Sequence, residues 1–257
     1  MEDDVTKLTG KIAWVTGAGT GIGEAAATVL AEEGATVVLS GRRRVLLEGV
    51  AARIMQKGGN ADVQNGDMTR KDDVARIAKH IKATHGRLDI LVNNAGVNIT
   101  PRHWNQISYE GIETMLDGNL TAAAFVAHAA LEIMRPQGDG LLVHTASIAG
   151  RNPGGFSGPL YGAAKHGVVA MSHTINMEEC INGIRSTVFL PGEVATPILD
   201  SRPNPVSPEM RALMVQSEDC GNLICYIACL PRHLVMNEVW LSPRHNRKYV
   251  ADLQKTL

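Results

Sequence analysis

Residues 12–34 read IAWVTGAGTGIGEAAATVLAEEG. The first five residues of this stretch are apolar or β-branched on both faces, which is typical of a central parallel strand covered on both sides. A glycine-rich turn follows, and the Ala-rich remainder predicts a helix that ends at Gly34. Glycines let the backbone approach a pyrophosphate, and a helix N-terminus offers free N–H groups. This strand–turn–helix unit therefore predicts dinucleotide binding.

Short β-branched runs alternate with longer helical stretches along the rest of the chain. Six further strands are expected at 35–40, 61–64, 88–94, 140–147, 184–190 and 237–242, with helices at 44–57, 71–84, 108–134 and 161–180. This alternation predicts right-handed crossovers between parallel strands. We expect an α/β fold: a doubly wound, seven-stranded parallel sheet of the Rossmann type, with helices on both faces and one domain over residues 1–257.

The composition excludes several classes of function. The 257 residues include 25 Lys and Arg against 26 Asp and Glu, which gives a formal net charge of −1. Proteins that bind nucleic acid by neutralising phosphates are usually distinctly basic. Only 4% of the residues are aromatic, which also disfavours a base-stacking platform. An apolar content of 44% excludes a disordered chain, so we expect a compact protein without a nucleic-acid partner.

Other features bear on the cellular compartment. The N-terminus MEDDVTKLTG lacks the apolar core of a signal peptide, and no apolar run reaches the roughly 18 residues of a membrane span. We interpret the cysteines, which form no C-x-x-C pair, as small apolar side chains in a reduced compartment rather than a metal or redox site. They are Cys180, Cys220, Cys225 and Cys229. We expect a cytoplasmic protein with no metal and no membrane contact.

The stretch TPILDSRPNPVSPEM, residues 196–210, breaks the alternation of strands and helices. Its four prolines disfavour regular structure, although Ser207-Pro208 fits the start of a short helix. One interpretation is a surface connection; the other is a lid over a site at the carboxyl ends of the strands. Because long irregular loops in compact domains tend to be functional, we favour a substrate lid at about 196–220.

The end of the second strand bears on which dinucleotide is bound. A carboxylate there would accept hydrogen bonds from the ribose hydroxyls of NAD, whereas a basic residue accommodates the 2′-phosphate of NADP. This chain has Gly41 at that place, and Arg42, Arg43 and Arg44 follow. The arginines either solvate the start of a helix or make bidentate contacts to phosphate. We assign Arg44 to solvent and Arg42, with Arg43 in support, to phosphate, and expect NADP (NADPH) rather than NAD.

Tyr161 and Lys165 lie four residues apart on an expected helix, so both side chains project from one face. A free tyrosine titrates at about pH 10, but a neighbouring ammonium favours the phenolate and lowers its pKa. Interconversion of an alcohol and a ketone needs such a proton-transfer group, because the cofactor supplies the hydride chemistry. A tyrosine and a lysine at this spacing are commonly just a partly exposed pair on a helix. In a chain that also contains a dinucleotide turn, the pair indicates acid/base catalysis.

Further motifs follow one another in a specific order. They are Thr16-Gly17-x-x-x-Gly21-Ile22-Gly23, Asn65-Gly66-Asp67, Asn93-Asn94-Ala95-Gly96, Asn119, Ser147, Tyr161-x-x-x-Lys165 and Pro191-Gly192. In this order and spacing the chain resembles the short-chain dehydrogenase/reductase family along almost its whole length. The resemblance implies an oxidoreductase that acts on CH–OH groups with NAD(P), and it implies assembly as a homotetramer.

The resemblance also implies roles for individual residues. Tyr161 would be the general acid/base, and Lys165 would tune it and hold the nicotinamide ribose. Ser147 would hydrogen-bond the substrate oxygen, and Asn119 would hold a water that links Lys165 to solvent. The cofactor would contact Gly17, Thr20, Gly21, Ile22, Gly23, Arg42, Arg43, Asp67, Met68, Asn94, Ala95, Gly96, Tyr161, Lys165, Pro191, Gly192, Val194 and Thr196. The substrate would meet Val97, Asn98, Gly155, Glu193, Ile198 and Leu199.

Three positions depart from the family pattern. Gly118 stands where valine is commoner; a mid-helix glycine costs up to about 1 kcal/mol relative to alanine and is compatible with a kink at Asn119. His144 stands where asparagine is frequent, and is either a proton-relay member or a hydrogen-bonded structural residue. Glu193 stands where an apolar residue is frequent, and either reaches the nicotinamide pocket or caps its loop.

Together these features predict an NADP(H)-dependent oxidoreductase that interconverts a ketone or aldehyde with an alcohol. One alternative is an NAD-dependent dehydrogenase of a sugar or small hydroxy acid. A second alternative, from a different class, is a non-catalytic NADP-binding redox sensor. The Tyr161 and Lys165 pair favours the enzyme over the sensor.

Overall fold

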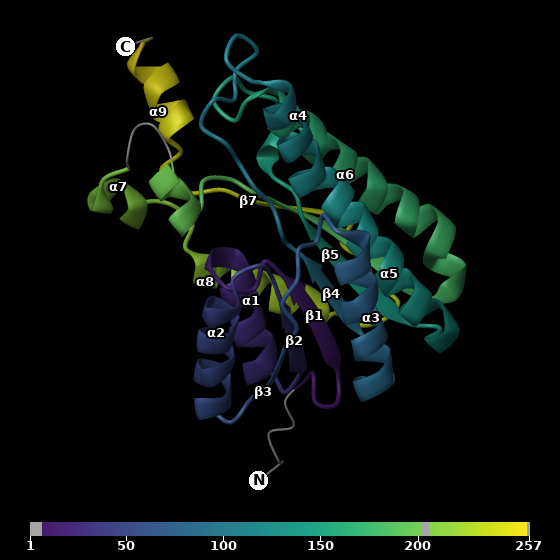
Figure 1. Cartoon of the computed structure of the whole chain (residues 1–257). Coiled ribbons are helices and arrows are strands. Elements are labelled where there is room, and N and C mark those ends of the chain that lie inside the picture. Colours follow the sequence, from purple (N-terminus) through teal and green to yellow (C-terminus); the bar gives the residue numbers. More distant parts are fainter. Residues whose placement is uncertain (1–6, 202–205, 256–257) are drawn as a thin grey trace.

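The computed structural model describes residues 7–201 and 206–255. A parallel seven-stranded sheet forms its centre, in the order β3-β2-β1-β4-β5-β6-β7 (Figure 1). The strands are β1 Ile12–Thr16, β2 Thr36–Ser40, β3 Asn60–Val63, β4 Ile90–Asn93, β5 Gly140–Thr145, β6 Ile184–Pro191 and β7 Glu238–Leu241. The strand order reverses between β1 and β4, which is where doubly wound sheets bind ligands. The predicted fold class is confirmed.

Helices cover both faces of the sheet, as the alternation of elements predicts (Figure 1). One face packs against α1 Gly21–Glu32, α2 Arg44–Gln56 and α8 Ser217–Ala228. The other packs against α3 Lys71–His85, α5 Ala122–Gln137 and α6 Pro159–Glu179, with α4 Tyr109–Leu116 beside α6. The sheet is therefore the middle layer of three.

The first strand is buried on both faces, in agreement with its apolar sequence. All five residues of β1 are buried, and Trp14 is fully so. The indole Nε1 of Trp14 donates a hydrogen bond to Ser40 Oγ in β2, at 2.9 Å. A buried indole N–H without a partner would cost free energy, so this bond lets a large aromatic side chain fill the core.

The single helix expected at 108–134 is divided into three parts, so that prediction was wrong in this respect. A π-helical turn, Asp117–Thr121, separates α4 from α5 and contains Gly118 and Asn119. A Cβ at Gly118 would lie 2.5 Å from Val97 Cγ2 in the segment after β4. Because Gly118 has no side chain, Val97 can pack against the helix. The kink near Asn119 is a π turn, which is a frequent feature of functional sites.

The expected lid segment is partly helical. It contains a short 3₁₀ turn, Pro197–Ser201, and α7, Pro208–Ala212; residues 202–205 of the prediction lie outside the described residues. Ser207 Oγ accepts a hydrogen bond from Met210 N at 3.3 Å, so the helix start expected at Ser207-Pro208 is confirmed.

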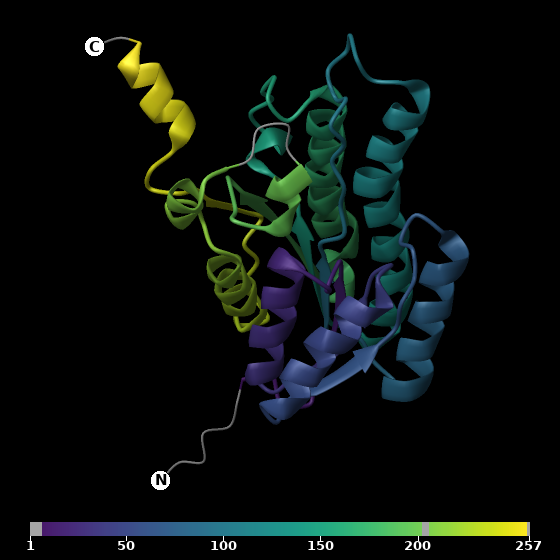
Figure 2. The ribbon, with the colours of Figure 1, turned by 60° about the vertical axis from the view of Figure 1, so that its left-hand side comes forward.

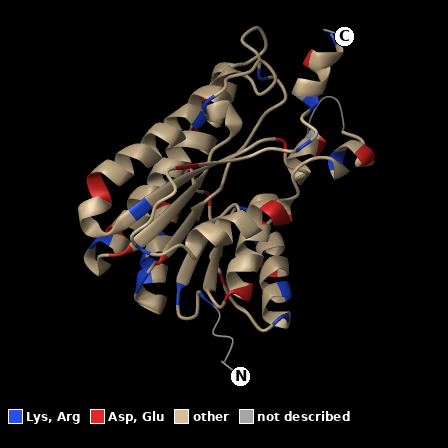
Figure 3. Ribbon diagram, turned by 180° about the vertical axis from the view of Figure 1, so that it is seen from behind, with Lys and Arg blue, Asp and Glu red and all other residues tan. Residues whose placement is uncertain are grey.

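A helix that the sequence did not reveal follows at the C-terminus. This helix, α9 Arg247–Gln254, projects from the body near α7 (Figures 1 and 2). In the described part of the chain, no helix combines the length and apolarity that a membrane crossing requires. Acidic and basic residues are interspersed over the outer helices (Figure 3), in keeping with the net charge of −1.

Candidate active site

A cleft of about 460 Å³ opens at the carboxyl ends of the strands. Its lining comes from segments far apart in the sequence: the glycine turn, the ends of β2 to β6, the start of α6, and the loop after β6. The parallel sheet brings them together because all its strands end at the same edge.

The glycine turn forms one wall of the cleft. Gly17 and Gly21 have φ values of +64° and +60°, a backbone region that glycine adopts without strain. A Cβ at Gly23 would lie 2.3 Å from Gly17 O, so only glycine fits there. The backbone therefore runs close to the cleft at the start of α1, where N–H groups are free to meet a phosphate.

Thr16 links this turn to the end of β4. Its Oγ1 accepts hydrogen bonds from the backbone N–H groups of Asn94 (2.9 Å) and Ala95 (3.0 Å). The Asn94 side chain donates to Thr16 O at 3.2 Å. These bonds hold the glycine turn and the segment after β4 in register across the switch point of the sheet. Sequence reasoning assigned no role to Thr16, although it precedes the first glycine of the turn.

The far end of the cleft carries the arginines expected to meet a phosphate. Arg42 and Arg43 line it and are exposed, and Arg43 Nη2 donates to Thr20 Oγ1 at 3.4 Å. Arg44 instead forms an exposed ion pair with Glu48 at 2.7 Å on α2. Arg42 and Arg43 thus border the cleft, whereas Arg44 pairs with Glu48 outside its lining.

Asp67 and Met68 line the same end of the cleft. Asp67 Oδ1 accepts hydrogen bonds from Thr69 N at 3.0 Å and Thr69 Oγ1 at 2.8 Å, which fix the turn after β3. Met68 is buried and belongs to the core between the sheet and α3. This pair supplies one polar and one apolar group beside the arginines.

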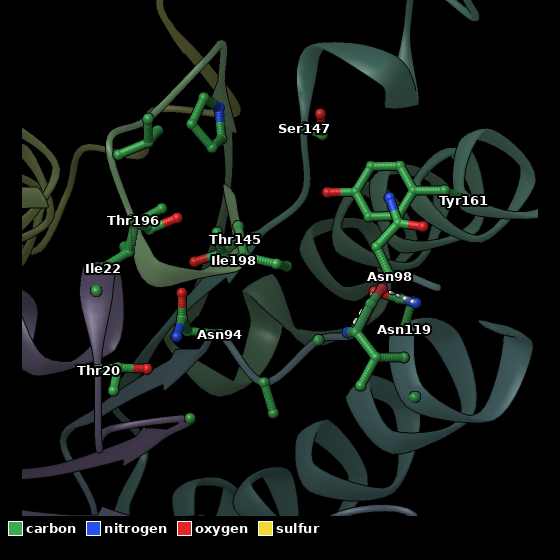
Figure 4. A pocket seen from close by; sticks show the side chains of 18 of the residues that line it. Thr20, Ile22, Asn94, Asn98, Asn119, Thr145, Ser147, Tyr161, Thr196 and Ile198 are labelled. Carbon is green, nitrogen blue, oxygen red and sulfur yellow. Dashed lines mark hydrogen bonds between the residues drawn. The ribbon is translucent and has the colours of Figure 1, made fainter. Parts of the chain in front are cut away.

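Ser147 and Tyr161 lie at the other end of the cleft. Figure 4 shows the Tyr161 hydroxyl pointing into the cleft on the side of Ser147, with Thr196 on the opposite side. Ser147 Oγ accepts a hydrogen bond from Ala149 N at 3.2 Å, where it caps a short 3₁₀ turn. A hydroxyl from a strand end and one from a helix start therefore face the same space.

Lys165 lies beneath Tyr161 and is only 4% exposed. Its Nζ donates to Thr145 O at 2.9 Å and lies 5.6 Å from the centroid of the Tyr161 ring. Burial disfavours the charged form and lowers the pKa of Lys165 from 10.5 to about 8. At neutral pH a buried positive charge therefore stands beside the tyrosine.

His144 is fully buried in β5. Its Nδ1 lies 3.2 Å from Asn93 Nδ2, whose other hydrogen is donated to Ala123 O at 2.8 Å. Burial first, and then the charge of Lys165, lower the pKa of His144 to about 4. The imidazole is therefore neutral at pH 7 and accepts through Nδ1, and its Nε2 has no hydrogen-bond partner among the described residues. This geometry favours the structural interpretation.

The Asn119 side chain is committed to backbone groups. Its Oδ1 accepts from Val97 N at 3.2 Å, and its Nδ2 donates to Val97 O and Met115 O, each at 2.9 Å. The π turn thereby holds the segment after β4 against α4. A Cβ at Gly96 would lie 3.0 Å from Asn119 Oδ1 and 3.7 Å from Lys165 Nζ, which places Gly96 between them.

The loop after β6 forms a second wall beside the glycine turn, where a Cβ at Gly21 would lie 3.1 Å from Thr196 Cγ2. Glu193 lines the cleft, and its carboxylate accepts hydrogen bonds from Arg247 Nε, at 2.7 Å, and Arg247 Nη2. This hydrogen bond raises the pKa of Arg247. Glu193 thus ties the start of α9 to the rim of the cleft, a role that sequence reasoning did not consider.

Nearly all the residues expected at the site are in the lining of one cleft. Gly23 and Gly155 are the exceptions. Gly23 packs behind the turn, and Phe156 and Ser157 line the cleft in place of Gly155. Arg102 also lines the cleft and was missed. Loop residues such as these three follow no periodic pattern, so no sequence signal placed them.

The four cysteines are free thiols. Burial raises the pKa of Cys220 and Cys225 to about 12, which makes both thiols unreactive at neutral pH. Cys229 is partly buried, whereas Cys180 is exposed at the end of α6. The interpretation as small apolar side chains in the core fits Cys220, Cys225 and Cys229 but not Cys180.

Comparison with known families agrees with this geometry. The family model for short chain dehydrogenase matches residues 11–206. An uncharacterized oxidoreductase of Staphylococcus aureus (strain MRSA252) is 35% identical over 239 residues, which are 93% of this chain and all of the relative. The chain is therefore a member of the short-chain dehydrogenase/reductase family and an oxidoreductase of that family.

Solved structures give the same result. A metagenomic short-chain oxidoreductase in complex with NADP superposes with a TM-score of 0.81 at 28% identity, covering 93% of this chain and 100% of that one. An alcohol dehydrogenase from the archaeon Thermococcus sibiricus, complexed with 5-hydroxy-NADP, has a TM-score of 0.84 at 26% identity, covering 92% and 98%.

Proposed function

We propose that this protein interconverts a ketone or aldehyde with the corresponding alcohol, using NADP(H), with Tyr161 as the general acid/base. The observation that carries the proposal is the buried Lys165 ammonium, 5.6 Å from the Tyr161 ring, at the floor of a cleft that begins at a dinucleotide turn. A buried cation beside a tyrosine in such a cleft has a direct chemical use, because it favours the phenolate.

The residues present fit a dinucleotide. The turn at Gly17 and Gly21 exposes backbone N–H groups. No side chain fits at Gly23, because its Cβ would lie 2.3 Å from Gly17 O. Arg42 and Arg43 line the end where a 2′-phosphate would lie. When bound, the nicotinamide supplies the hydride chemistry.

The proton chemistry belongs to this chain. In the reductive direction Tyr161 would donate its hydroxyl proton to the carbonyl oxygen, and in the oxidative direction its phenolate would accept the proton of the alcohol. Lys165 would stabilise the phenolate by its charge, and Ser147 would donate a hydrogen bond to the substrate oxygen. Asn119, whose side chain is bonded to the backbone of Val97, would hold a water that links Lys165 to solvent.

Preference for NADP is supported by two independent observations. Arg42 and Arg43 line the cleft while Arg44 turns away to Glu48. In addition, two solved structures similar to this chain, named above, contain NADP or a modified NADP.

Turnover of a carbonyl and alcohol panel, followed by nicotinamide absorbance, tests the proposed reaction. Tyr161→Phe should lower kcat by about 10²–10⁴ with little change in NADPH affinity, since a phenyl ring cannot transfer the proton. Unchanged turnover in Tyr161→Phe would refute the role of Tyr161. NADPH binding without turnover of any panel member would favour a redox sensor.

The cofactor preference has a matched set of variants. Arg42→Ala and Arg43→Ala should each weaken NADPH binding by roughly 1.5–3 kcal/mol, the range for hydrogen bonds to charged groups, without weakening NADH binding. Arg44→Ala removes a neighbouring guanidinium that pairs with Glu48 and should change neither. Equal affinity of the wild type for NADPH and NADH would refute the preference.

We further propose that this single-domain protein works in the cytoplasm as a homotetramer, and that residues at about 196–220 close over the substrate. Val97, Asn98, Ile198 and Leu199 line the cleft on the side where the substrate would enter. Sedimentation equilibrium tests the assembly. Protection of the segment from protease by substrate and NADPH together tests the lid.

A further inference from the structure

A second cluster of polar side chains lies between the edge strand β3 and the end of α3. Asp62 Oδ2 is 2.7 Å from His80 Nε2 and 3.1 Å from His85 Nε2. Gln64 Nε2 is 2.9 Å from Asp62 Oδ1 and 3.0 Å from His80 Nε2. Thr84 Oγ1 is 3.4 Å from the same His80 nitrogen. All five residues lie outside the lining of the cleft.

Hydrogen bonds alone do not satisfy this cluster. If His80 Nε2 is protonated and donates to Asp62, its contact with Gln64 Nε2 is between two donors and is unfavourable. If His80 Nε2 is unprotonated, its lone pair faces the Asp62 carboxylate instead. Turning the Gln64 amide over relieves the first conflict but places its oxygen against Asp62 Oδ1. With Asp62 ionised, no placement of the His80 proton and of the Gln64 amide makes all three short contacts favourable.

A cation between the carboxylate and the two imidazoles would turn the contacts of Asp62 with His80 and His85 into shared coordination. Nε2 of His80, Nε2 of His85 and one carboxylate oxygen of Asp62 lie within 4.8 Å of one another, close enough for one ion to bind all three. Both imidazoles would then present lone pairs, and Gln64 would keep its hydrogen bond to the other Asp62 oxygen as an orienting contact. We propose that Asp62, His80 and His85 form a binding site for a divalent transition-metal ion, with Zn²⁺ as its ligand in the cell.

The charge around the site suits a cation. The Asp62 carboxylate places a negative charge against both imidazoles. His85 is the last residue of α3, where the helix carbonyls carry partial negative charge. The side chains of Asp62, His80 and His85 are 21%, 34% and 14% exposed, so an ion can enter and retain a solvent ligand.

The ligand types select the metal. Two imidazoles and one carboxylate suit Zn²⁺ and its neighbours, whereas Ca²⁺ and Mg²⁺ prefer oxygen ligands alone. The ion would join the edge strand β3 to α3. The site does not depend on the proposed oxidoreductase activity, since its residues lie outside the cleft.

Zinc titration of the purified protein tests the proposal. Isothermal calorimetry should give about one Zn²⁺ per chain, with weaker binding at acidic pH because the imidazoles must be unprotonated. Saturation at about 100 times the dissociation constant should raise Tm by roughly 5 °C. Asp62→Asn, His80→Gln and His85→Gln should each weaken binding at least about 100-fold, and Gln64→Leu about 10-fold. Melting without metal checks that each variant folds.

Two controls separate this site from others in the chain. His233→Gln changes an exposed imidazole in the loop before β7 and should leave zinc binding unchanged. Substituted Co²⁺ should show d–d bands without a thiolate charge-transfer band; a thiolate band would locate the metal at the cysteines and overturn the proposal. Absence of zinc binding, or binding that survives in all three ligand variants, would overturn it equally.

Discussion

One wall of the cleft is built from backbone, and the wall beside it is held by charged side chains. In the first wall, Gly17 and Gly23 place main chain against main chain, and Thr16 fixes the end of β4 by hydrogen bonds. In the second, the loop after β6 is tied to α9 by the ion pair of Glu193 and Arg247. Backbone packing is intolerant of added atoms, whereas partly exposed ion pairs contribute little energy.

The two walls differ in how readily their residues can be substituted. A wall made by steric contact preserves one shape, which suits a dinucleotide whose form is constant. A wall held by a few side-chain contacts can change residues at small cost, which suits a substrate that differs between relatives. Lys165 forms a buried polar floor to the cleft, and His144 is buried beneath the cleft in β5; both are nine-tenths or more buried.

The backbone wall should fail on addition of one methyl group. Gly23→Ala places a Cβ 2.3 Å from Gly17 O and 2.7 Å from Asn94 Nδ2, so we expect a loss of about 3 kcal/mol in unfolding free energy and loss of measurable NADPH binding. Urea unfolding and NADPH fluorescence measure these changes.

Gly49→Ala is the matched control, because its Cβ would meet only Arg53 Nη1 at 3.6 Å on α2. Alanine there should stabilise the helix by about 0.5–1 kcal/mol and leave NADPH binding intact. Near-normal NADPH affinity in Gly23→Ala would show that the turn adapts, against the distinction drawn between the walls.

At Lys165, on the floor of the cleft, we expect that a substitution which stabilises the fold abolishes activity. The folded-state pKa of Lys165 is about 8 against 10.5 ordinarily, so below pH 8 the folded protein bears the full cost of a buried charge. Lys165→Met should therefore raise the unfolding free energy at pH 7 by roughly 1–3 kcal/mol while it abolishes turnover.

From pH 8 to pH 10.5 the unfolded chain binds the Lys165 proton and the folded chain does not, so the wild type gains stability as the pH rises. The advantage of Lys165→Met should disappear over this range. Urea unfolding at pH 7 and at pH 10 measures both values. A variant less stable than the wild type at pH 7 would contradict the burial cost.

His144 should make the protein sensitive to acid. Its folded-state pKa is about 4 against 6.5 ordinarily, so the stability it contributes is present above pH 6.5 and is lost as the pH falls toward 4. The loss should amount to about 3 kcal/mol over that range. In His144→Asn this part of the pH dependence should vanish, and in the exposed control His233→Gln it should persist. Parallel pH profiles of wild type and His144→Asn would refute the assignment.

The charged wall should respond least. Glu193→Gln weakens a pair that is about a quarter to a third exposed, so we expect at most about 1 kcal/mol, a change in substrate KM below about fivefold, and unchanged NADPH affinity. Steady-state kinetics with both substrates measure this split. Arg44→Met, which removes an exposed pair beside the other wall, should change neither constant. A tenfold loss of NADPH affinity in Glu193→Gln would show that the second wall also holds the cofactor.

Local pattern was sufficient for most of the fold. The buried strand at Ile12–Thr16, the turn after it and the helix beyond were predictable because each depends on neighbours in sequence. The helices α8 and α9 were not predicted, although both are amphipathic, so the miss does not reflect a missing local pattern. The π turn at Gly118, by contrast, lies against Val97, a contact that no local pattern encodes.

The candidate site divides similarly. Tyr161 and Lys165 could be paired from their spacing on one helix, and the spacing of Gly17, Gly21 and Gly23 indicated the turn. Arg102 and Phe156, by contrast, reach the cleft from loops, where neither spacing nor periodicity constrains a side chain. The sequence left two roles open for Glu193, and its partner Arg247 lies 54 residues away.

From its sequence alone the chain was determined to be a doubly wound sheet with a dinucleotide turn and a tyrosine–lysine pair, because helix and strand periods and glycine conformations are properties of short segments. Tertiary structure alone decided that Lys165 loses solvent and lowers its pKa to about 8, that Glu193 pairs with Arg247, and that Asp62 meets two histidines of α3. Burial and side-chain pairing depend on which distant segments pack together, and that is settled only when the whole sheet has formed.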